Sequence, residues 1–157
     1  MEDVLEYLVE HPTTKAALAS LVWSSGSIPM SERAKMLVLA DGKIEGTVGG
    51  GCLEAEIVAS GRQVIDKGVA QETRYTMTEQ RAGESGLNCG GTVRIYTEPL
   101  GVSAVVDMYG RVVEARRQRR PCCLVTLLEG DGAKMFFDGS TSIGTMGKPA
   151  WDMEART

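Results

Sequence analysis

The residues best suited to chemistry lie in one short run, GTVGGGCLE, at residues 46–54. Gly49, Gly50 and Gly51 lack Cβ atoms, so the backbone there can approach a ligand closely and adopt positive φ angles. Cys52 follows at once and stands where a helical pattern begins. The N–H groups of a helix's first turn lack internal partners and, with the helix dipole, favour a phosphate and a thiolate. The run therefore predicts an anion cradle and an activated thiol in the same place.

A tight strand-to-helix connection, in which the glycines only allow close packing, is the alternative interpretation of this run. The run is not a P-loop, since no Gly-Lys-Ser/Thr follows the glycines. It also lacks the G-x-G-x-x-G spacing of a dinucleotide-binding fold. The glycine spacing alone does not decide between the two interpretations.

A second cysteine–glycine element, Cys89-Gly90-Gly91, stands just before a predicted strand. In the functional interpretation it lies opposite Cys52 and closes a pocket around a ligand. In the structural interpretation it is a β-bulge or turn with a buried thiol. Both interpretations stay open on the sequence alone.

The remaining candidate groups give weaker signals. Cys122 and Cys123 are adjacent and form no C-x-x-C pair, and His11 is the single histidine, which removes most zinc-finger arrangements. Each cysteine is also compatible with a small buried hydrophobic residue. A basic cluster near residues 111–120 favours either a solvated helix end or docking to an acidic partner. Its members are Arg111, Arg116, Arg117, Arg119 and Arg120.

The elements that must position these groups follow from apolar periodicity and turn residues. Helices are predicted at residues 2–10, 52–68 and 105–115, with Gly68 ending the second. An Asp-Gly pair at Asp41 and Gly42 predicts a hairpin. Strands are predicted at residues 16–23, 34–40, 43–48, 71–77, 92–98 and 122–128, the first of them buried on both faces.

Two short motifs occur twice along the chain. A-K-M at residues 34–36 returns at 133–135, and G-T-V-G at 46–49 returns as G-T-M-G at 144–147. In the second copy Lys148 and Pro149 follow the turn instead of more glycines and a cysteine. We therefore expect two helix–strand–hairpin copies, at about residues 2–68 and 103–150.

The predicted fold class is mixed α/β. We expect one largely buried mixed sheet with flanking helices, in a single domain over residues 1–157. The net charge of −4 gives no general attraction to nucleic acid or an anionic membrane. No apolar stretch reaches the roughly 20 residues that cross a bilayer, and the acidic N-terminus is unlike a secretory signal. These features predict a cytoplasmic protein that binds neither nucleic acid nor membrane.

Two segments carry a resemblance to a known family. Residues 17–58, from ALASLVWSSG through GTVGGGCLEAEIV, and the later GLNCGGTVRIYTEPL resemble the N-terminal domain of the xanthine dehydrogenase accessory factor family, XdhC/CoxI. Longer members continue into a C-terminal Rossmann-like domain, which we expect to be absent here. In the loop between the first two strands, Ile28, Met30 and Arg33 stand where relatives often have serine, arginine and glycine. An anion contact by that loop would be altered, with Arg33 as a substitute charge.

The resemblance implies a chaperone for the molybdenum cofactor (molybdopterin), bound transiently, and not an enzyme. Implied partners are a target molybdoenzyme apoprotein, cofactor biosynthesis or sulfuration proteins, and a separate Rossmann-domain subunit; a homodimer is also plausible. Cys52 is then a candidate contact for molybdenum, whose soft sulfur chemistry suits a thiolate. The candidate cofactor-binding residues are Gly49, Gly50, Gly51, Cys52, Glu54, Cys89, Gly90 and Gly91.

Two alternatives come from other functional classes. The first is a thiol-dependent sulfur-transfer or redox enzyme with Cys52 as the catalytic nucleophile. The second is the partner-docking half of a split accessory factor, which the arginine cluster would serve. The sequence leaves the target enzyme and any nucleotide binding open.

Overall fold

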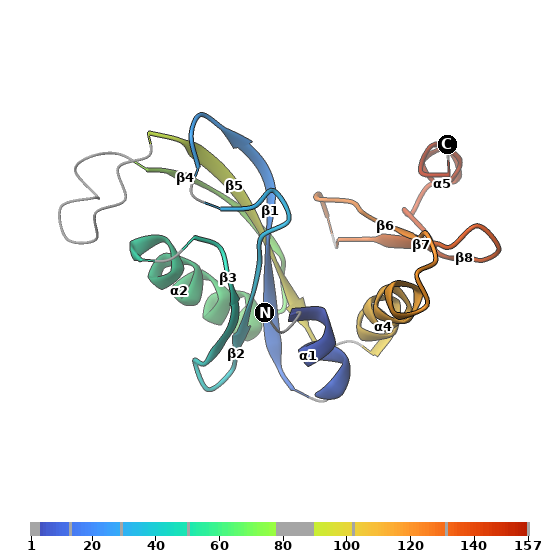
Figure 1. The fold of residues 1–157 in the computed structure, drawn as a ribbon, viewed down its shortest axis with the longest axis horizontal. Helices are drawn as coiled ribbons and strands as arrows, with labels where there is room; N and C mark the ends of the chain where they lie inside the picture. Colours follow the sequence, from blue (N-terminus) through green and yellow to red (C-terminus); the bar gives the residue numbers. More distant parts are fainter. Residues whose placement is uncertain are drawn as a thin grey trace. The chain divides into compact units, whose positions relative to one another are not determined.

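Helices are interspersed with groups of two or three strands along the described chain, which confirms the predicted mixed α/β class (Figure 1). The computed structural model describes residues 4–12, 14–28, 30–49, 51–77, 90–101, 103–130 and 132–156. These divide into two compact units, Met1–Val4 with Thr14–Leu100, and Leu5–Thr13 with Gly101–Thr157. The single domain over residues 1–157 stays a prediction, because this division does not show which parts fold independently.

The first unit is built on a five-stranded sheet in the order β3-β2-β1-β5-β4. Every neighbouring pair of these strands is antiparallel. The central strand β1 has a continuous buried run from Ala16 to Ser20, in agreement with the predicted burial on both faces, and becomes more exposed beyond it. The strands are β1 (Ala16–Ser25), β2 (Lys35–Leu39), β3 (Ile44–Thr47), β4 (Gln71–Thr76) and β5 (Thr92–Leu100).

The predicted hairpin between β2 and β3 is present. The N–H of Gly42 donates to the carbonyl of Leu39 at 2.9 Å, and Gly42 has φ 88°. A type I turn followed by a glycine in this conformation is a common three-residue hairpin loop. The carboxylate of Asp41 accepts the N–H of Lys43 at 3.0 Å, which stabilises the turn.

The expectation of a single mixed sheet is wrong. The described strands form two sheets, and their named pairs are all antiparallel. The physical reason is that strand pairing joins segments far apart in the sequence, which the alternation of apolar residues does not specify. Among the described strands, a second sheet is formed in the order β6-β7-β8 by β6 (Cys123–Thr126), β7 (Lys134–Phe137) and β8 (Ser142–Gly144).

Strand β5 also runs further than predicted, through Pro99 to Leu100. A proline removes one ladder hydrogen bond and is tolerated where an edge is open. Pairing with β4 stops at Gln71 opposite Thr97, so β5 has no β4 partner at Pro99, while on its other side Pro99 lies opposite Ala17 of β1.

Helix α2 (Cys52–Lys67) lies on one face of the five-stranded sheet and contacts β1, β5 and β2 (Figure 1). As predicted, Gly68 ends it in a left-handed conformation, with its N–H bonded to the carbonyl of Val64. Gly61 allows the closest approach, since a Cβ built there would lie 2.9 Å from atoms of Val38. The buried face of the helix comprises Leu53, Ile57, Ser60, Gly61 and Val64.

The second unit combines the three-stranded sheet with helices α1 (Val4–Glu10, of which all but Val4 belong to this unit), α4 (Ser103–Arg117) and α5 (Pro149–Glu154). Arg117 contacts Glu6 and Glu10 of α1 at 3.6 and 4.0 Å. Arg120 contacts Asp138 at 3.1 Å. Two members of the arginine cluster are thus engaged in ion pairs within the chain, which favours the structural interpretation for those two.

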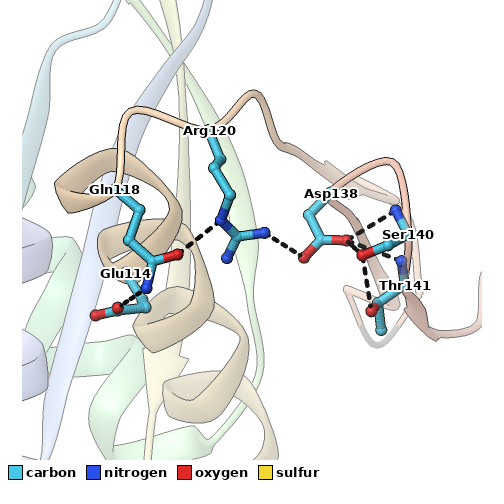
Figure 2. A network of polar contacts seen from close by, with 6 residues as sticks. All are labelled: Glu114, Gln118, Arg120, Asp138, Ser140 and Thr141. Carbon is cyan, nitrogen blue, oxygen red and sulfur yellow. Dashed lines mark hydrogen bonds and ion pairs between the residues drawn. The ribbon is translucent and has the colours of Figure 1, made fainter.

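Asp138 is the centre of a polar network at the turn between β7 and β8 (Figure 2). Its carboxylate accepts the N–H of Thr141 at 2.8 Å, and the N–H and hydroxyl of Ser140 at 3.1 and 2.9 Å. These donors, with Arg120, hold the pKa of Asp138 well below its usual value. The network reaches α4 through Gln118, which accepts from Arg120 at 2.7 Å and donates to Glu114.

None of the described helices combines the length and the apolar character that a membrane-spanning helix needs.

Candidate functional site

The glycine turn that follows β3 leads directly to an exposed cysteine. Gly49 has φ 118°, and Gly51, the N-cap of α2, has φ 67° and ψ −141°. An L-residue with a side chain rarely adopts such angles, so these two glycines are required by the backbone path. Cys52 is the first residue of α2, as predicted, and it is an exposed thiol outside any disulfide. Gly50 lies outside the described residues.

Glu54, in the first turn of α2, is linked to the glycine turn by hydrogen bonds. Its carboxylate accepts the hydroxyl of Thr47 at 2.6 Å, and the same hydroxyl oxygen accepts the N–H of Gly49 at 3.2 Å. We call the contacts among Thr47, Gly49 and Glu54 the first latch. The latch spans the end of β3, the turn and the first turn of α2. Glu54 therefore has a structural partner that the sequence analysis missed.

The second copy contains an equivalent arrangement, here called the second latch. Asp152 accepts the hydroxyl of Thr145 at 3.0 and 3.2 Å and the N–H of Met146 at 2.6 Å. Thr145 in turn accepts the N–H of Gly147 at 3.0 Å. The hydroxyl and the acid are seven residues apart in both latches. That shared spacing is the sequence signal by which the latches could have been found.

Other contacts have counterparts in the second copy. Lys35 donates to the hydroxyl of Ser20 at 3.0 Å, and Lys134 donates to that of Thr126 at 2.9 Å. Cβ atoms built at Gly46 and Gly144 would lie 2.6 and 2.2 Å from the carbonyl oxygens of the two lysines. These glycines, with φ 80° and 93°, lie opposite Met36 and Met135 in their hairpins. The contacts support a repeat of the strand–hairpin–turn region.

The second cysteine–glycine element is described only in part, because Cys89 lies outside the described residues. Gly90 forms a parallel bridge with Ser27, and a Cβ built at Gly91 would lie 2.3 Å from the Ser27 carbonyl oxygen. Gly91 therefore permits a close backbone approach, which is a structural reason for that glycine. A pocket closed by Cys89 opposite Cys52 stays a prediction.

One hydrophobic cluster borders the segments that the sequence analysis singled out. It includes Val48 and Leu53, which flank the glycine turn, and Val93, near the start of β5. Ile28 and Met30 pack against it. The two residues that replace a serine and an arginine of relatives thus contact the core, whereas Arg33 is exposed.

The described residues contain no group of three or more His, Cys, Asp or Glu side chains that could hold a metal ion. Cys123 is exposed and Cys122 half-buried. His11 lies at the end of α1, where its ring stacks on Tyr7 with centroids 4.2 Å apart. A metal centre built from protein side chains is therefore not found among the described residues.

The chain is similar to a known family, to a curated protein and to a solved structure. Residues 11–76 match the model of the XdhC and CoxI family. The uncharacterized protein YqeB of Escherichia coli (strain K12) is 32% identical over 102 residues, which cover 65% of this chain and 19% of that protein. A crystal structure from Bacillus halodurans, described as a xanthine dehydrogenase, superposes with a TM-score of 0.79 at 22% identity, covering 96% of this chain and 47% of the other.

The matches differ in what they show. The chain spans about a fifth of the Escherichia coli relative and about half of the Bacillus halodurans chain. At 22% identity the superposition shows a shared fold. The family match covers β1, β2, β3, α2 and β4, and so contains the glycine turn, Cys52 and the first latch.

Proposed function

Because residues 11–76 match the model of the XdhC and CoxI family, we propose that the protein takes part in the maturation of xanthine dehydrogenase-like molybdoenzymes. In this role it binds the molybdenum cofactor transiently and passes it to the enzyme's apoprotein. Cofactor biosynthesis or sulfuration proteins, and a separate Rossmann-domain subunit, are further partners under this proposal.

One observation supports placing the functional site at Cys52. The turn-to-helix element occurs twice, but only the first copy presents an exposed thiol on the first residue of a long helix. The second glycine turn lies 98 residues after the first, so that Ala150 corresponds to Cys52. The helix at that turn, α5, has only six residues. Since the fold forms this element without the cysteine, Cys52 is available for function.

The residues present fit the chemistry of the cofactor. Its phosphate suits the backbone N–H groups at the start of α2, where the N-cap Gly51 has no side chain to cover them. When bound, the cofactor supplies a molybdenum atom with oxygen and sulfur ligands, for which a thiolate is a suitable soft donor. Gly49, Gly51 and Cys52 would hold it, with Gly50, Cys89, Gly90 and Gly91 as further candidate contacts.

The test is retention of the cofactor by the purified protein. Wild type, Cys52→Ala and Cys123→Ala are incubated with molybdenum cofactor, separated from free cofactor, and analysed for bound molybdenum by mass spectrometry. Cys123→Ala is the matched control, since it removes another exposed thiol. We expect Cys52→Ala to retain about 10-fold less molybdenum, as when a ligand's support is lost. Equal retention by all three proteins would remove Cys52 from the site.

Delivery is tested separately. Loaded protein is mixed with the apoprotein of a xanthine dehydrogenase-like enzyme, and the enzyme's activity is followed. We expect activation by loaded wild type beyond that given by the same amount of free cofactor. Activation no greater than that of free cofactor would contradict a role in maturation.

A further inference from the structure

Cys52 lies between the threonine and the acid of the first latch in the sequence. The latch joins Thr47, the last residue of β3, to Glu54 in the first turn of α2. The Thr47 hydroxyl donates to the carboxylate and accepts from Gly49, so both its donor and its acceptor direction are used. Linked hydrogen bonds of this kind hold each other's orientation. The turn that carries Cys52 is thus fixed at both ends.

Comparison of the latches shows what differs around the thiol. At the repeat offset of 98 residues, Thr47 corresponds to Thr145 and Glu54 to Asp152. Helix α5 begins at Pro149, which corresponds to Gly51, whereas α2 begins one position later, at Cys52. The first copy therefore has one more non-helical residue inside its latch. Its acid is Glu, whose additional methylene reaches across this longer turn.

The engagement of Glu54 also bears on its predicted role. An acidic residue in the first helical turn commonly interacts with the helix's own N-terminal N–H groups. Here the Glu54 carboxylate accepts the hydroxyl of Thr47 at 2.6 Å. A side chain held in this way acts on the site through the turn.

We propose that Thr47 and Glu54 are positioning residues for Cys52, and that Glu54 acts through Thr47 and does not contact the cofactor. The latch fixes the direction in which the thiol leaves the first turn of α2. The inference rests on the proposed function for its ligand. Its effect on the thiol itself can be measured without any cofactor.

The experiment uses Thr47→Val, Glu54→Ala and Glu54→Gln in the full chain. Each variant is exposed briefly to iodoacetamide, and modification of the Cys52 peptide is measured by mass spectrometry. Thr47→Val and Glu54→Ala open the latch, and we expect the rate of Cys52 alkylation to rise about 3-fold. Retained molybdenum should fall about 10-fold in the same variants. Glu54→Gln keeps an oxygen that accepts the Thr47 hydroxyl, and should match wild type in both measurements.

The second latch provides the matched controls, Thr145→Val and Asp152→Ala. These variants break the same contacts in the copy without a cysteine, and should leave Cys52 alkylation and molybdenum retention at wild-type values. Equal changes in the controls, wild-type behaviour of Thr47→Val, or a Glu54→Gln variant that behaves like Glu54→Ala would each overturn the inference. If wild type retains no molybdenum, the proposed function fails, and alkylation alone decides the positioning role.

Discussion

The two glycine turns of this chain share their backbone and latch contacts and differ in the residues that follow the turn. Both have a positive-φ glycine against a lysine carbonyl, and a latch whose threonine and acid are seven positions apart. The first turn continues through Gly51 to an exposed Cys52, whereas the second continues through Lys148 and Pro149 into a six-residue helix. The shared parts are therefore explained by folding. The parts confined to the first copy are where function is to be sought.

The largest expected effect tests the shared backbone contacts. Gly46→Ala and Gly144→Ala place a Cβ against a backbone carbonyl at a positive φ, and each should lower the free energy of unfolding by about 3 kcal/mol. Denaturant unfolding measures this. Trp23 reports on the first unit and Trp151 on the second, in variants that keep one tryptophan. A variant as stable as wild type would show that its turn is not required by the fold.

The next prediction compares alanine substitutions at the N-cap residues of α2 and α5. Gly51 is the N-cap of α2 at φ 67°, while Lys148 is the N-cap of α5 at φ −140°, an extended conformation open to any residue. Gly51→Ala should cost about 2 kcal/mol. Lys148→Ala should cost less than about 1 kcal/mol, from the loss of its exposed cation–π contact with Trp151. Thermal unfolding of both variants compares them, and similar losses would contradict a special backbone path in the first copy.

A smaller effect concerns the latches. Glu54→Ala removes the acceptor of an exposed hydrogen bond and Asp152→Ala that of a half-buried one, and each should lower stability by about 1 kcal/mol. Asp152 also accepts the N–H of Met146, so its loss should be the greater of the two. Urea unfolding of the two variants provides the comparison. A larger loss of unfolding free energy in Glu54→Ala than in Asp152→Ala would contradict this prediction.

The smallest effect is a pH dependence at the two hairpin turns. The N–H of Lys43 lowers the pKa of Asp41, and the N–H of Thr141, with Ser140, lowers that of Asp138 much further. A lowered folded-state pKa gives stability above the unfolded value of about 3.9, and this is lost as the pH falls through the folded value. Asp138→Asn should therefore be less stable than Asp41→Asn at neutral pH.

The pH dependence is read from melting temperatures between neutral pH and pH 3. Both differences from wild type should shrink on acidification, that of Asp138→Asn by more. A difference that grows in acid would contradict the assigned cause.

The sequence was sufficient where local rules decide the structure. The 3.6-residue period and Gly68 predict α2, and Asp41-Gly42 predicts the hairpin. The single mixed sheet was wrong because strand pairing is long-range. No local signal shows that β1 pairs with β5 along residues 16–25 and 92–100. The strand predicted at residues 92–98 continues through Pro99, which is tolerated because β4 has no residue opposite it.

The candidate site was predictable to a similar degree. Glycine spacing and the change of period placed Cys52 at the start of a helix, which the structure confirms. The role of Glu54 was not foreseen, because its contact with Thr47 joins a strand end to a helix across a turn of unknown path. Gly91 was counted as a ligand contact, yet its approach to Ser27 supplies a packing reason that only coordinates reveal.

The position of β5 between β1 and β4 has a consequence for synthesis of the chain. Residues 11–76 carry the family match, but within the sheet β4 has only β5 as its neighbour. While the chain emerges from the ribosome, the second edge of β1, with its buried residues from Ala16 to Ala19, stays open until residue 100 has been made. Unpaired apolar strand edges of this kind aggregate readily. A nascent chain paused between residues 76 and 92 should therefore be the form most dependent on chaperones.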